Sequence, residues 1–257
     1  MSCQPDNDEN TSTNNGGNNN GGNTNPTANH TCGEPNIHNP NLTYGSLTDQ
    51  EGNTYKTIVI GTQEWMAENL KTSIYRNGDP IPTNLDSATW ANTTNGAWGY
   101  YNNDNSYACP YGKLYNWHAC MDYRQLCPVG WHVPSDAEWS TLINFLDPSA
   151  DGGNNSNNAG EQMKTVGEID DGTGLWDEEN GITGSNSSGL SGVPGGIFIG
   201  PHFQSNDPGR RGHWWSTSLS PSSYPAPWVR ILRHDRHSAV RNTCNHKFAL
   251  SVRCVRD

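Results

Sequence analysis

Apolar residues show clear helical spacing at one place in the chain. Four of them lie at positions i, i+3, i+4 and i+7 of one helix face: Trp139, Leu142, Ile143 and Leu146. Ser135 precedes this face and Glu138 follows Ser135 by three residues, which is the capping-box pattern of a helix N-terminus. Asp147 and Pro148 come next, and proline disfavours a helical conformation in the residue before it. The pattern predicts an amphipathic helix that starts after Ser135 and stops at Asp147.

The other periodic segments are short, and most have the alternation of β-strands. A turn at 49–53 precedes the apolar run 55–60, which predicts a hairpin. The segment 63–70 follows, as a helix or a strand. Three more strands are predicted, at 214–217, 228–232 and 248–255. In the last of these, alternate residues share one face: Phe248, Leu250, Val252 and Cys254.

Composition favours a loop-rich extracellular domain. The 257 residues include 28 Gly and 10 Trp, and only 32% are hydrophobic and 16% charged. A short helix at 161–166 and loops from 167 to 212 complete a prediction of a loop-rich α+β fold. Residues 1–31 are dominated by Asn, Gly and Thr, a composition that buries too little apolar surface to fold. We therefore expect a disordered tether at 1–31 and one folded domain at 32–257.

Basic charge is concentrated near the C-terminus of an acidic chain. The net charge is -11, which argues against nucleic acid as a partner. Between residues 210 and 257, eight arginines are opposed only by Asp235 and Asp257. Such asymmetry can steer an anionic ligand to one end of a protein. The alternative is that these arginines are solvated or paired with the acidic body.

The N-terminal residues carry a possible anchor. Cys3 is followed by an acidic, Asn-rich stretch, and no segment is long and apolar enough to span a membrane. This start resembles the mature N-terminus of a bacterial lipoprotein with an acidic surface-export signal. The resemblance implies lipidation of Cys3, contact with a membrane only through that lipid, and a place on the outer membrane facing outward or in a pilus-like assembly. The alternative is a stray cysteine in a tail.

Four separated motifs resemble one known family. They are the segments 65–70, 111–117, 127–139 and 251–257. In this order they resemble the Fibrobacter succinogenes major paralogous domain family, over about residues 44–257. The resemblance implies a surface or secreted protein with a C-type-lectin-like fold, akin to the formylglycine-generating enzyme fold.

The segment 219–249 carries a second, narrower resemblance. Its flanks, 214–217 and 251–257, are similar to those of Bacteroides-type variable proteins of diversity-generating retroelements. Adenine randomisation in such systems turns Asn codons into a limited set of residues that lacks Glu, Gln, Met, Lys and Trp. Residues 219–249 contain no Glu, Gln or Met, and only Trp228 and Lys247 lie outside that set. Few asparagines remain there, which departs from the pattern.

These resemblances imply ligand binding rather than catalysis, through a rigid scaffold that displays the segment 219–249. The side chains expected to contact the ligand are Tyr224, Val229, Ile231, Arg233, His234, Asp235, Arg236, His237, Thr243 and His246. The expected partner is a protein or charged glycan on another cell or a phage. The alternatives are a structural subunit of a pilus-like or surface assembly and a formylglycine-type oxidoreductase, which would need a redox-active cysteine pair.

Seven cysteines allow a disulfide framework. The lectin-like resemblance implies a bridge between Cys127 and Cys254, with a stabilisation of about 4 kcal/mol. Cys109 and Cys120 flank the segment 111–117 and form a possible second pair. Cys32 and Cys244 either pair with each other or stay free. If Cys244 arose by randomisation, we expect it to be an exposed, unpaired thiol.

No cofactor or metal is expected. Ca²⁺ remains open at the loop that holds Asp147 and Asp151, because carboxylates are hard oxygen ligands, although a plain loop is the simpler interpretation. His234, Asp235, His237 and His246 are interpreted as ligand contacts rather than as metal ligands. Trp214 and Trp215 could stack on sugars, but the family resemblance places them in the core.

Overall fold

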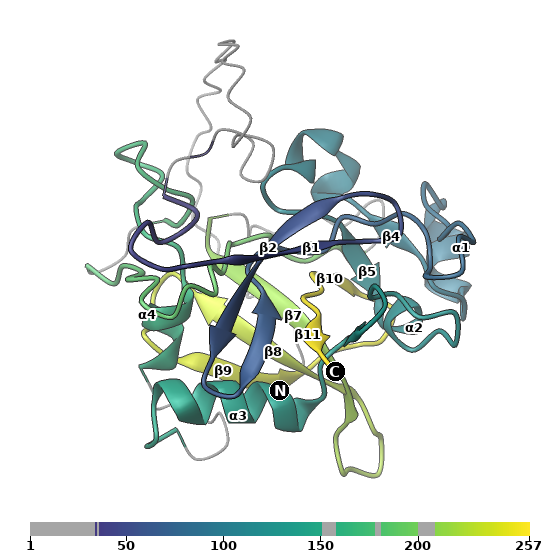
Figure 1. The fold of residues 1–257 in the computed structure, drawn as a ribbon. Coiled ribbons are helices and arrows are strands. Elements are labelled where there is room, and N and C mark those ends of the chain that lie inside the picture. The colour runs from purple at the N-terminus through teal and green to yellow at the C-terminus, as the bar shows by residue number, and fades with distance from the viewer. Residues whose placement is uncertain (1–33, 35, 151–157, 178–180, 200–208) are drawn as a thin grey trace.

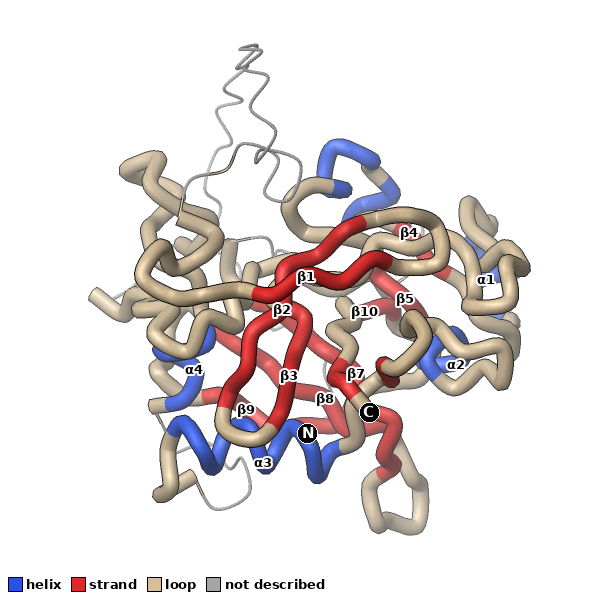
Figure 2. Tube along the Cα trace, viewed as in Figure 1, coloured by secondary structure: helices blue, strands red, loops and turns tan. Residues whose placement is uncertain are grey.

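A computed structural model describes residues 34, 36–150, 158–177, 181–199 and 209–257. The described chain forms three small antiparallel sheets, several short helices and long connections between them (Figures 1 and 2). It confirms the predicted loop-rich α+β class. The expected tether at 1–31, the lipidation site Cys3 and Asp151 of the possible Ca²⁺ loop lie outside the described residues.

The first sheet joins segments from both ends of the described chain. Its strand order is β1 (Gly45–Thr48), β2 (Thr54–Ile60), β3 (Gln63–Met66), β11 (Val255–Arg256) and β6 (Trp131–His132). The β1–β2 turn confirms the predicted hairpin, and the Asp49 carboxylate holds it by accepting the amides of Glu51 and Asn53 at 2.9 Å each. Gly61 turns the chain between β2 and β3 with φ +62, in the left-handed region that glycine favours. The predicted segment 63–70 begins with this strand, because its residues 63–66 form β3.

Two three-stranded sheets complete the sheet structure. One has the order β10 (Ala249–Leu250), β5 (Leu114–Asn116) and β4 (Trp98–Gly99), and the other has the order β7 (Arg211–Leu219), β8 (Pro227–Arg233) and β9 (Ala239–Thr243). The helices are α1 (Ser87–Asn92), α2 (Trp117–Cys120), α3 (Asp136–Leu146) and α4 (Ala159–Met163), with 3₁₀ turns η1 (Tyr101–Asn103) and η2 (Asn105–Ala108). None of the described helices has the length and apolar character to cross a membrane.

The predicted amphipathic helix is confirmed as α3. Ser135 is its N-cap, and its side chain and that of Glu138 form the reciprocal hydrogen bonds of a capping box. The buried face of α3 packs between the first sheet and the β7–β8–β9 sheet, with Trp139 stacked against Trp65 at 4.5 Å between ring centroids. Trp214 lies in the same cluster, so this part of the core is built largely from indole rings.

The two adjacent tryptophans of β7 are core residues, as the family resemblance implied. Trp214 and Trp215 point to opposite faces of the strand, and both are buried. The Trp214 Nε1 donates to Asn69 Oδ1 at 2.9 Å, and the Trp215 Nε1 donates to the Tyr115 carbonyl at 2.7 Å. Burial with satisfied N–H groups leaves neither ring free to stack on a sugar.

The predicted last strand at 248–255 is wrong as a single element. Residues 249–250 belong to one sheet and residues 255–256 to another, because the chain crosses between sheets in the interval. The predicted inward face is nevertheless real: Phe248, Leu250, Val252 and Cys254 all contribute to one core cluster. The strand β9 was not predicted, since its sequence Ala-Val-Arg-Asn-Thr has little alternation.

The disulfide between Cys127 and Cys254 is confirmed, with a Cα–Cα distance of 6.0 Å. It links residues 127 positions apart, for which the chain-entropy model gives a stabilisation of about 5 kcal/mol. The proposed pair of Cys109 with Cys120 is wrong, because Cys120 is a buried free thiol on α2 that donates toward the Asn116 carbonyl. Cys109 and Cys244 are each disulfide-bonded, and Cys244 is buried rather than an exposed thiol.

Candidate ligand-binding surface

The predicted contact residues separate into two groups at opposite ends of β8. The β7–β8 loop lies at one end of this seven-residue strand and the β8–β9 turn at the other (Figure 1), about 20 Å apart at the usual rise per residue. We call residues 220–226 the tip loop and residues 234–238 the basic turn. Thr243 and His246 lie toward the tip-loop end, because the Cys244 amide donates to the Pro227 carbonyl at 3.0 Å.

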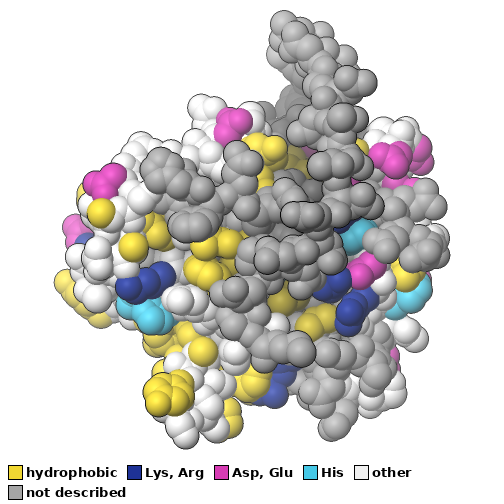
Figure 3. Space-filling view, turned by 180° about the vertical axis from the view of Figure 1, so that it is seen from behind, with side chains coloured by type: hydrophobic (Ala, Val, Ile, Leu, Met, Phe, Trp, Pro, Cys, Tyr) yellow, Lys and Arg dark blue, Asp and Glu magenta, His cyan; other side chains and the backbone are white. Residues whose placement is uncertain are grey.

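The tip loop presents an aromatic side chain to solvent. Tyr224 is 90% exposed, although residues beside it are held by hydrogen bonds. The Ser220 amide donates to the Ala226 carbonyl at 2.9 Å, the Ala226 amide donates to Ser220 Oγ at 3.1 Å, and Ser222 Oγ donates to the Tyr224 carbonyl at 2.7 Å. Viewed from behind, this loop projects from the body with a hydrophobic end (Figure 3). Hydrogen bonds therefore hold the base of the loop, while the Tyr224 side chain remains exposed to solvent.

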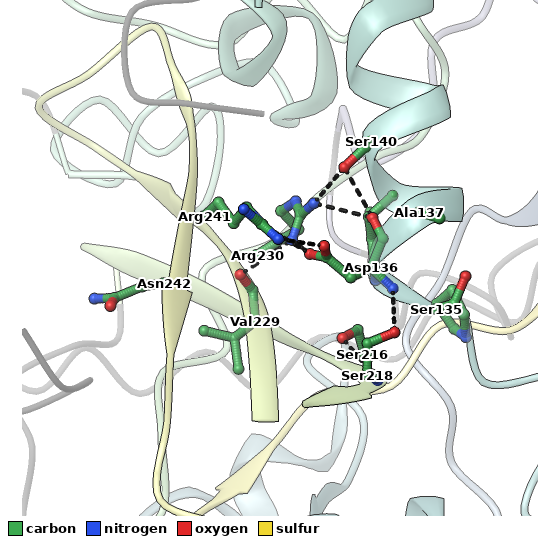
Figure 4. Close-up of polar contacts among 12 residues, drawn as sticks. Ser135, Asp136, Ala137, Ser140, Ser216, Ser218, Val229, Arg230, Arg241 and Asn242 are labelled. Carbon is green, nitrogen blue, oxygen red and sulfur yellow. Dashed lines mark hydrogen bonds and ion pairs between the residues drawn. The ribbon is translucent and has the colours of Figure 1, made fainter. Parts of the chain in front are cut away.

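An ion-pair cluster beneath the sheet, which we call the Asp136 clamp, ties α3 to β8 and β9 (Figure 4). Asp136 Oδ1 accepts from Arg230 Nη1 at 2.7 Å and from Arg241 Nε at 3.0 Å, and Asp136 Oδ2 accepts from Arg241 Nη2 at 2.6 Å. Arg230 is fully buried and also donates to Ser140 Oγ at 2.9 Å. The Asp136 amide donates to Ser218 Oγ of β7 at 3.0 Å. All three strands are thereby fixed to one helix N-terminus.

Electrostatics in the clamp favour the ionised carboxylate. Burial raises the pKa of Asp136, but hydrogen bonds and charge from Arg241 and Arg230 outweigh burial, so the net pKa is lowered. Arg241 also stacks on Trp228, with the guanidinium carbon 3.7 Å from the ring centroid. The half-buried Trp228 is therefore packed against a residue of the clamp.

The basic turn is held from below by a buried lysine. Lys164 Nζ donates to the carbonyls of Arg233 and Arg236 at 3.0 Å each, and burial lowers the pKa of Lys164 to about 8. Arg233 makes two hydrogen bonds of 2.7 Å to the carboxylate of Asp235. That contact lowers the pKa of Asp235 to about 2. The turn is thus held by hydrogen bonds from Lys164 to its backbone carbonyls and by the ion pair between Arg233 and Asp235.

The arginine surplus of the C-terminal region is reduced in three dimensions, because carboxylates from outside the region pair with four of its arginines. Six of its arginines lie within 4.0 Å of a carboxylate: Arg210, Arg230, Arg233, Arg236, Arg241 and Arg256. Arg253 is buried and donates to Asn69 Oδ1 and to the carbonyls of Leu190 and Ser191. The basis for steering an anionic ligand is therefore weaker than the arginine count suggested, and pairing with the acidic body accounts for four of these arginines.

Three predicted contact residues are buried. Val229 and Ile231 lie on the inward face of β8 in the main core cluster, and His234 is only 6% exposed. Both faces of β8 are covered, because Val229 and Ile231 pack into one core cluster and Leu232, on the other face, packs into a second. The remaining predicted contacts are at least partly accessible: Tyr224, Arg233, Asp235, Arg236, His237, Thr243 and His246.

His118 joins the predicted group, although no feature of the sequence indicated it. It lies on α2, and its ring meets that of His246 edge-on at 5.2 Å between centroids. Burial lowers the pKa of His118, and His246 and Lys247 lower it further. The pair comes from segments far apart in the chain, so no local pattern could reveal it. Among the described residues no group of three or more His, Cys, Asp or Glu side chains is arranged to hold a metal.

The cysteine geometry gives no support to redox chemistry at the C-terminal cysteines. Cys254 is bonded to Cys127, and Cys244 is in a disulfide that does not include Cys254. Burial raises the pKa of the Cys120 thiol. The pair that a formylglycine-type oxidoreductase would need is not formed by Cys244 and Cys254.

These features describe a disulfide-linked, loop-rich α+β domain that displays two turns of its C-terminal sheet. The chain belongs to the Fibrobacter succinogenes major domain family, whose model matches residues 58–256. Neither a curated protein nor a solved structure matches the chain.

Proposed function

We propose that this chain is a cell-surface ligand-binding protein, with a C-type-lectin-like scaffold, that contacts its partner through the tip loop. The observation that carries this proposal is Tyr224, which is 90% exposed on a loop closed by its own hydrogen bonds. An exposed aromatic side chain gains a large buried area on binding and loses little conformational freedom. Tyrosine is also among the residues that dominate interface energetics.

The Asp136 clamp supports a binding role because it makes the display surface rigid. Strands β7, β8 and β9 are each linked to the N-terminus of α3. A surface ordered before binding loses less entropy when a ligand docks. Thr243, His246 and His118 extend the contact area at the same end of the sheet. The partner we favour is a protein or glycan on another cell or a phage, recognised by aromatic and hydrogen-bonding groups more than by charge.

We further propose that the displayed positions are diversified by a retroelement. Burial within 219–249 separates residues that a core must keep from residues that are free to vary. Val229, Leu232, Ala239 and Cys244 are buried, whereas residues 221–225, Arg236, His237, Asn245 and His246 are exposed. A second near-copy of the DNA for about residues 210–257, differing at adenines and at codons of the exposed positions, is the expected finding at the locus. If the locus holds no such copy, the retroelement proposal fails, and an adhesin whose binding surface does not vary becomes the leading hypothesis.

Binding is tested with two matched tyrosine variants. Tyr224→Ala and Tyr123→Ala remove the same side chain from positions that are both 90% exposed, but only Tyr224 lies in the tip loop. We expect Tyr224→Ala to weaken adherence of purified protein to bacterial and host cells by about tenfold, as for an interface hot spot, and Tyr123→Ala to leave it unchanged. Equal adherence of the two variants would contradict the proposal. Capture of a protein from the same cell would instead indicate an assembly subunit.

A further inference from the structure

A concave surface lies next to β4, away from the tip loop (Figure 1). It encloses about 480 Å³. Its lining combines two aromatic rings with small polar side chains: Thr83, Asn84, Trp98, Tyr100, Asn103, Asp104 and Asn105. We call this the β4 groove. Its size falls within the range of small-molecule sites in proteins.

The aromatic rings of the β4 groove are fixed in place. Trp98 and Tyr100 meet edge-on, with centroids 5.2 Å apart, and both are only half-buried. The Trp98 Nε1 donates to the Ile81 carbonyl at 3.1 Å, and the Trp98 amide donates to the Pro82 carbonyl at 2.9 Å. Lys113 Nζ lies 4.5 Å from the Trp98 ring centroid, so one face of the indole is already occupied. The ring also packs against the main core cluster, and its remaining exposed part lines the groove.

The polar rim of the groove is also ordered and carries unused hydrogen-bonding groups. Asn84 and Asn103 have φ values of +55 and +57, and Asp104 Oδ1 caps η2 by accepting the Ser106 amide at 2.9 Å. No residue in the described part of the chain hydrogen-bonds to the side-chain amides of Asn84, Asn103 or Asn105. Each amide offers both a donor and an acceptor. The rim thus presents paired donors and acceptors beside an aromatic platform.

Charge at the groove argues against an ionic ligand of either sign. Lys113 over the Trp98 ring opposes a cation, and the exposed carboxylate of Asp104 opposes an anion. Glu51 adds negative charge near Tyr100. A purely apolar ligand would leave the amide rim desolvated and unpaired, which costs free energy. A neutral ligand with many hydroxyl groups satisfies all of these constraints, because its C–H faces pack on aromatic rings and its hydroxyls exchange hydrogen bonds with amides.

We propose that the β4 groove binds a neutral oligosaccharide. Trp98 and Tyr100 stack on sugar rings, while Asn84, Asn103 and Asn105 read the hydroxyl groups. The site is separate from the tip loop, so the protein would have two binding surfaces. This groove would hold a neutral glycan independently of the partner recognised by Tyr224.

The test is calorimetric titration of the whole chain with neutral trisaccharides of glucose, xylose, mannose and galactose, together with tetramethylammonium and a sulfated trisaccharide as charged probes. We expect saturable binding of at least one neutral sugar and none of the charged probes. Tyr100→Ala should weaken that binding about tenfold, and the exposed-site variant Asn105→Ala should weaken it less. Tyr123→Ala, at an exposed tyrosine outside both surfaces, is the matched control and should bind as the wild type does.

Three results would overturn the proposal: no binding of any neutral sugar at millimolar concentration, tighter binding of a charged probe, or equal affinity of the wild type and both groove variants. Circular dichroism of each variant separates loss of the site from loss of the fold. Failure at the groove with intact Tyr224-dependent adherence would leave the proposed tip-loop function unaffected.

Discussion

The Asp136 clamp makes a quantitative prediction about stability. In Asp136→Asn the carboxylate is replaced by an amide of the same shape, so packing is retained while the charge and one acceptor oxygen are lost. Arg230 is then a fully buried guanidinium without a counter-ion, and its Nε already has no hydrogen-bond partner among the described residues. Burial lowers the pKa of Arg230, and Asp136 counteracts part of that shift.

The expected cost follows from burial. Removing one partner of a buried pair typically destabilises by about 3–5 kcal/mol. The amide introduced by the substitution can still accept one hydrogen bond, and Arg241 is 29% exposed and partly solvated, so the lower end of the range, about 3 kcal/mol, applies. For a domain of this size that corresponds to a fall in Tm of about 10 °C.

Urea titration monitored by circular dichroism measures the effect, with an unchanged m-value required for interpretation. The matched control is Glu64→Gln, which neutralises a carboxylate paired at 2.6 Å with Arg256, a side chain that is 63% exposed. We expect that control to cost less than about 1 kcal/mol. Because Arg230→Met removes the orphaned charge, the double variant Arg230→Met/Asp136→Asn should be more stable than Asp136→Asn alone. Equal losses for Asp136→Asn and Glu64→Gln would refute the reasoning.

Two further predictions concern the basic turn and the disulfide. Burial lowers the pKa of Lys164 to about 8 from 10.5, so between these values the unfolded chain binds more protons than the folded chain, and the Lys164 contribution to stability should rise with pH. The free energies of unfolding of the wild type and of Lys164→Met are measured from pH 7.5 to 9.5, roughly the lower part of that window. The difference between them should rise with pH, and a difference that does not change with pH would contradict the prediction. Replacing Cys127 and Cys254 by alanine should cost about 5 kcal/mol, whereas Cys120→Ala, which breaks no bridge, should cost about 1 kcal/mol; similar losses would argue against the bridge as a major source of stability.

Local sequence signals predicted the elements that depend on neighbouring residues. The capping box of α3 and the Asp49 turn are made within a few positions of the chain, so their patterns are legible without a structure. The strand β9 and the division of 248–255 between two sheets depend on partners elsewhere, and no pattern within the segment records them.

The candidate site was predicted less well for the same reason. Counting arginines near the C-terminus suggested a basic surface, but the carboxylate that pairs with Arg230 lies 94 positions earlier in the chain. Alternation in 228–232 correctly indicated a strand, yet it could not show that β8 is covered on both faces. The exposure of Tyr224, in a loop of small residues and prolines between two strands, was predictable from local sequence, as was that of Arg236 and His237 in a polar turn.

The position of β11 has a consequence for how the protein matures. This strand pairs with β3 on one side and β6 on the other, so residues 255–256 complete a sheet whose first strand starts at Gly45. The sheet cannot close, and Cys254 cannot reach Cys127, until those residues have left the ribosome. Nearly the whole domain is therefore synthesised before its first sheet can be completed. The disulfide between Cys127 and Cys254 can form only after that point, so it is among the last links of the fold to be made.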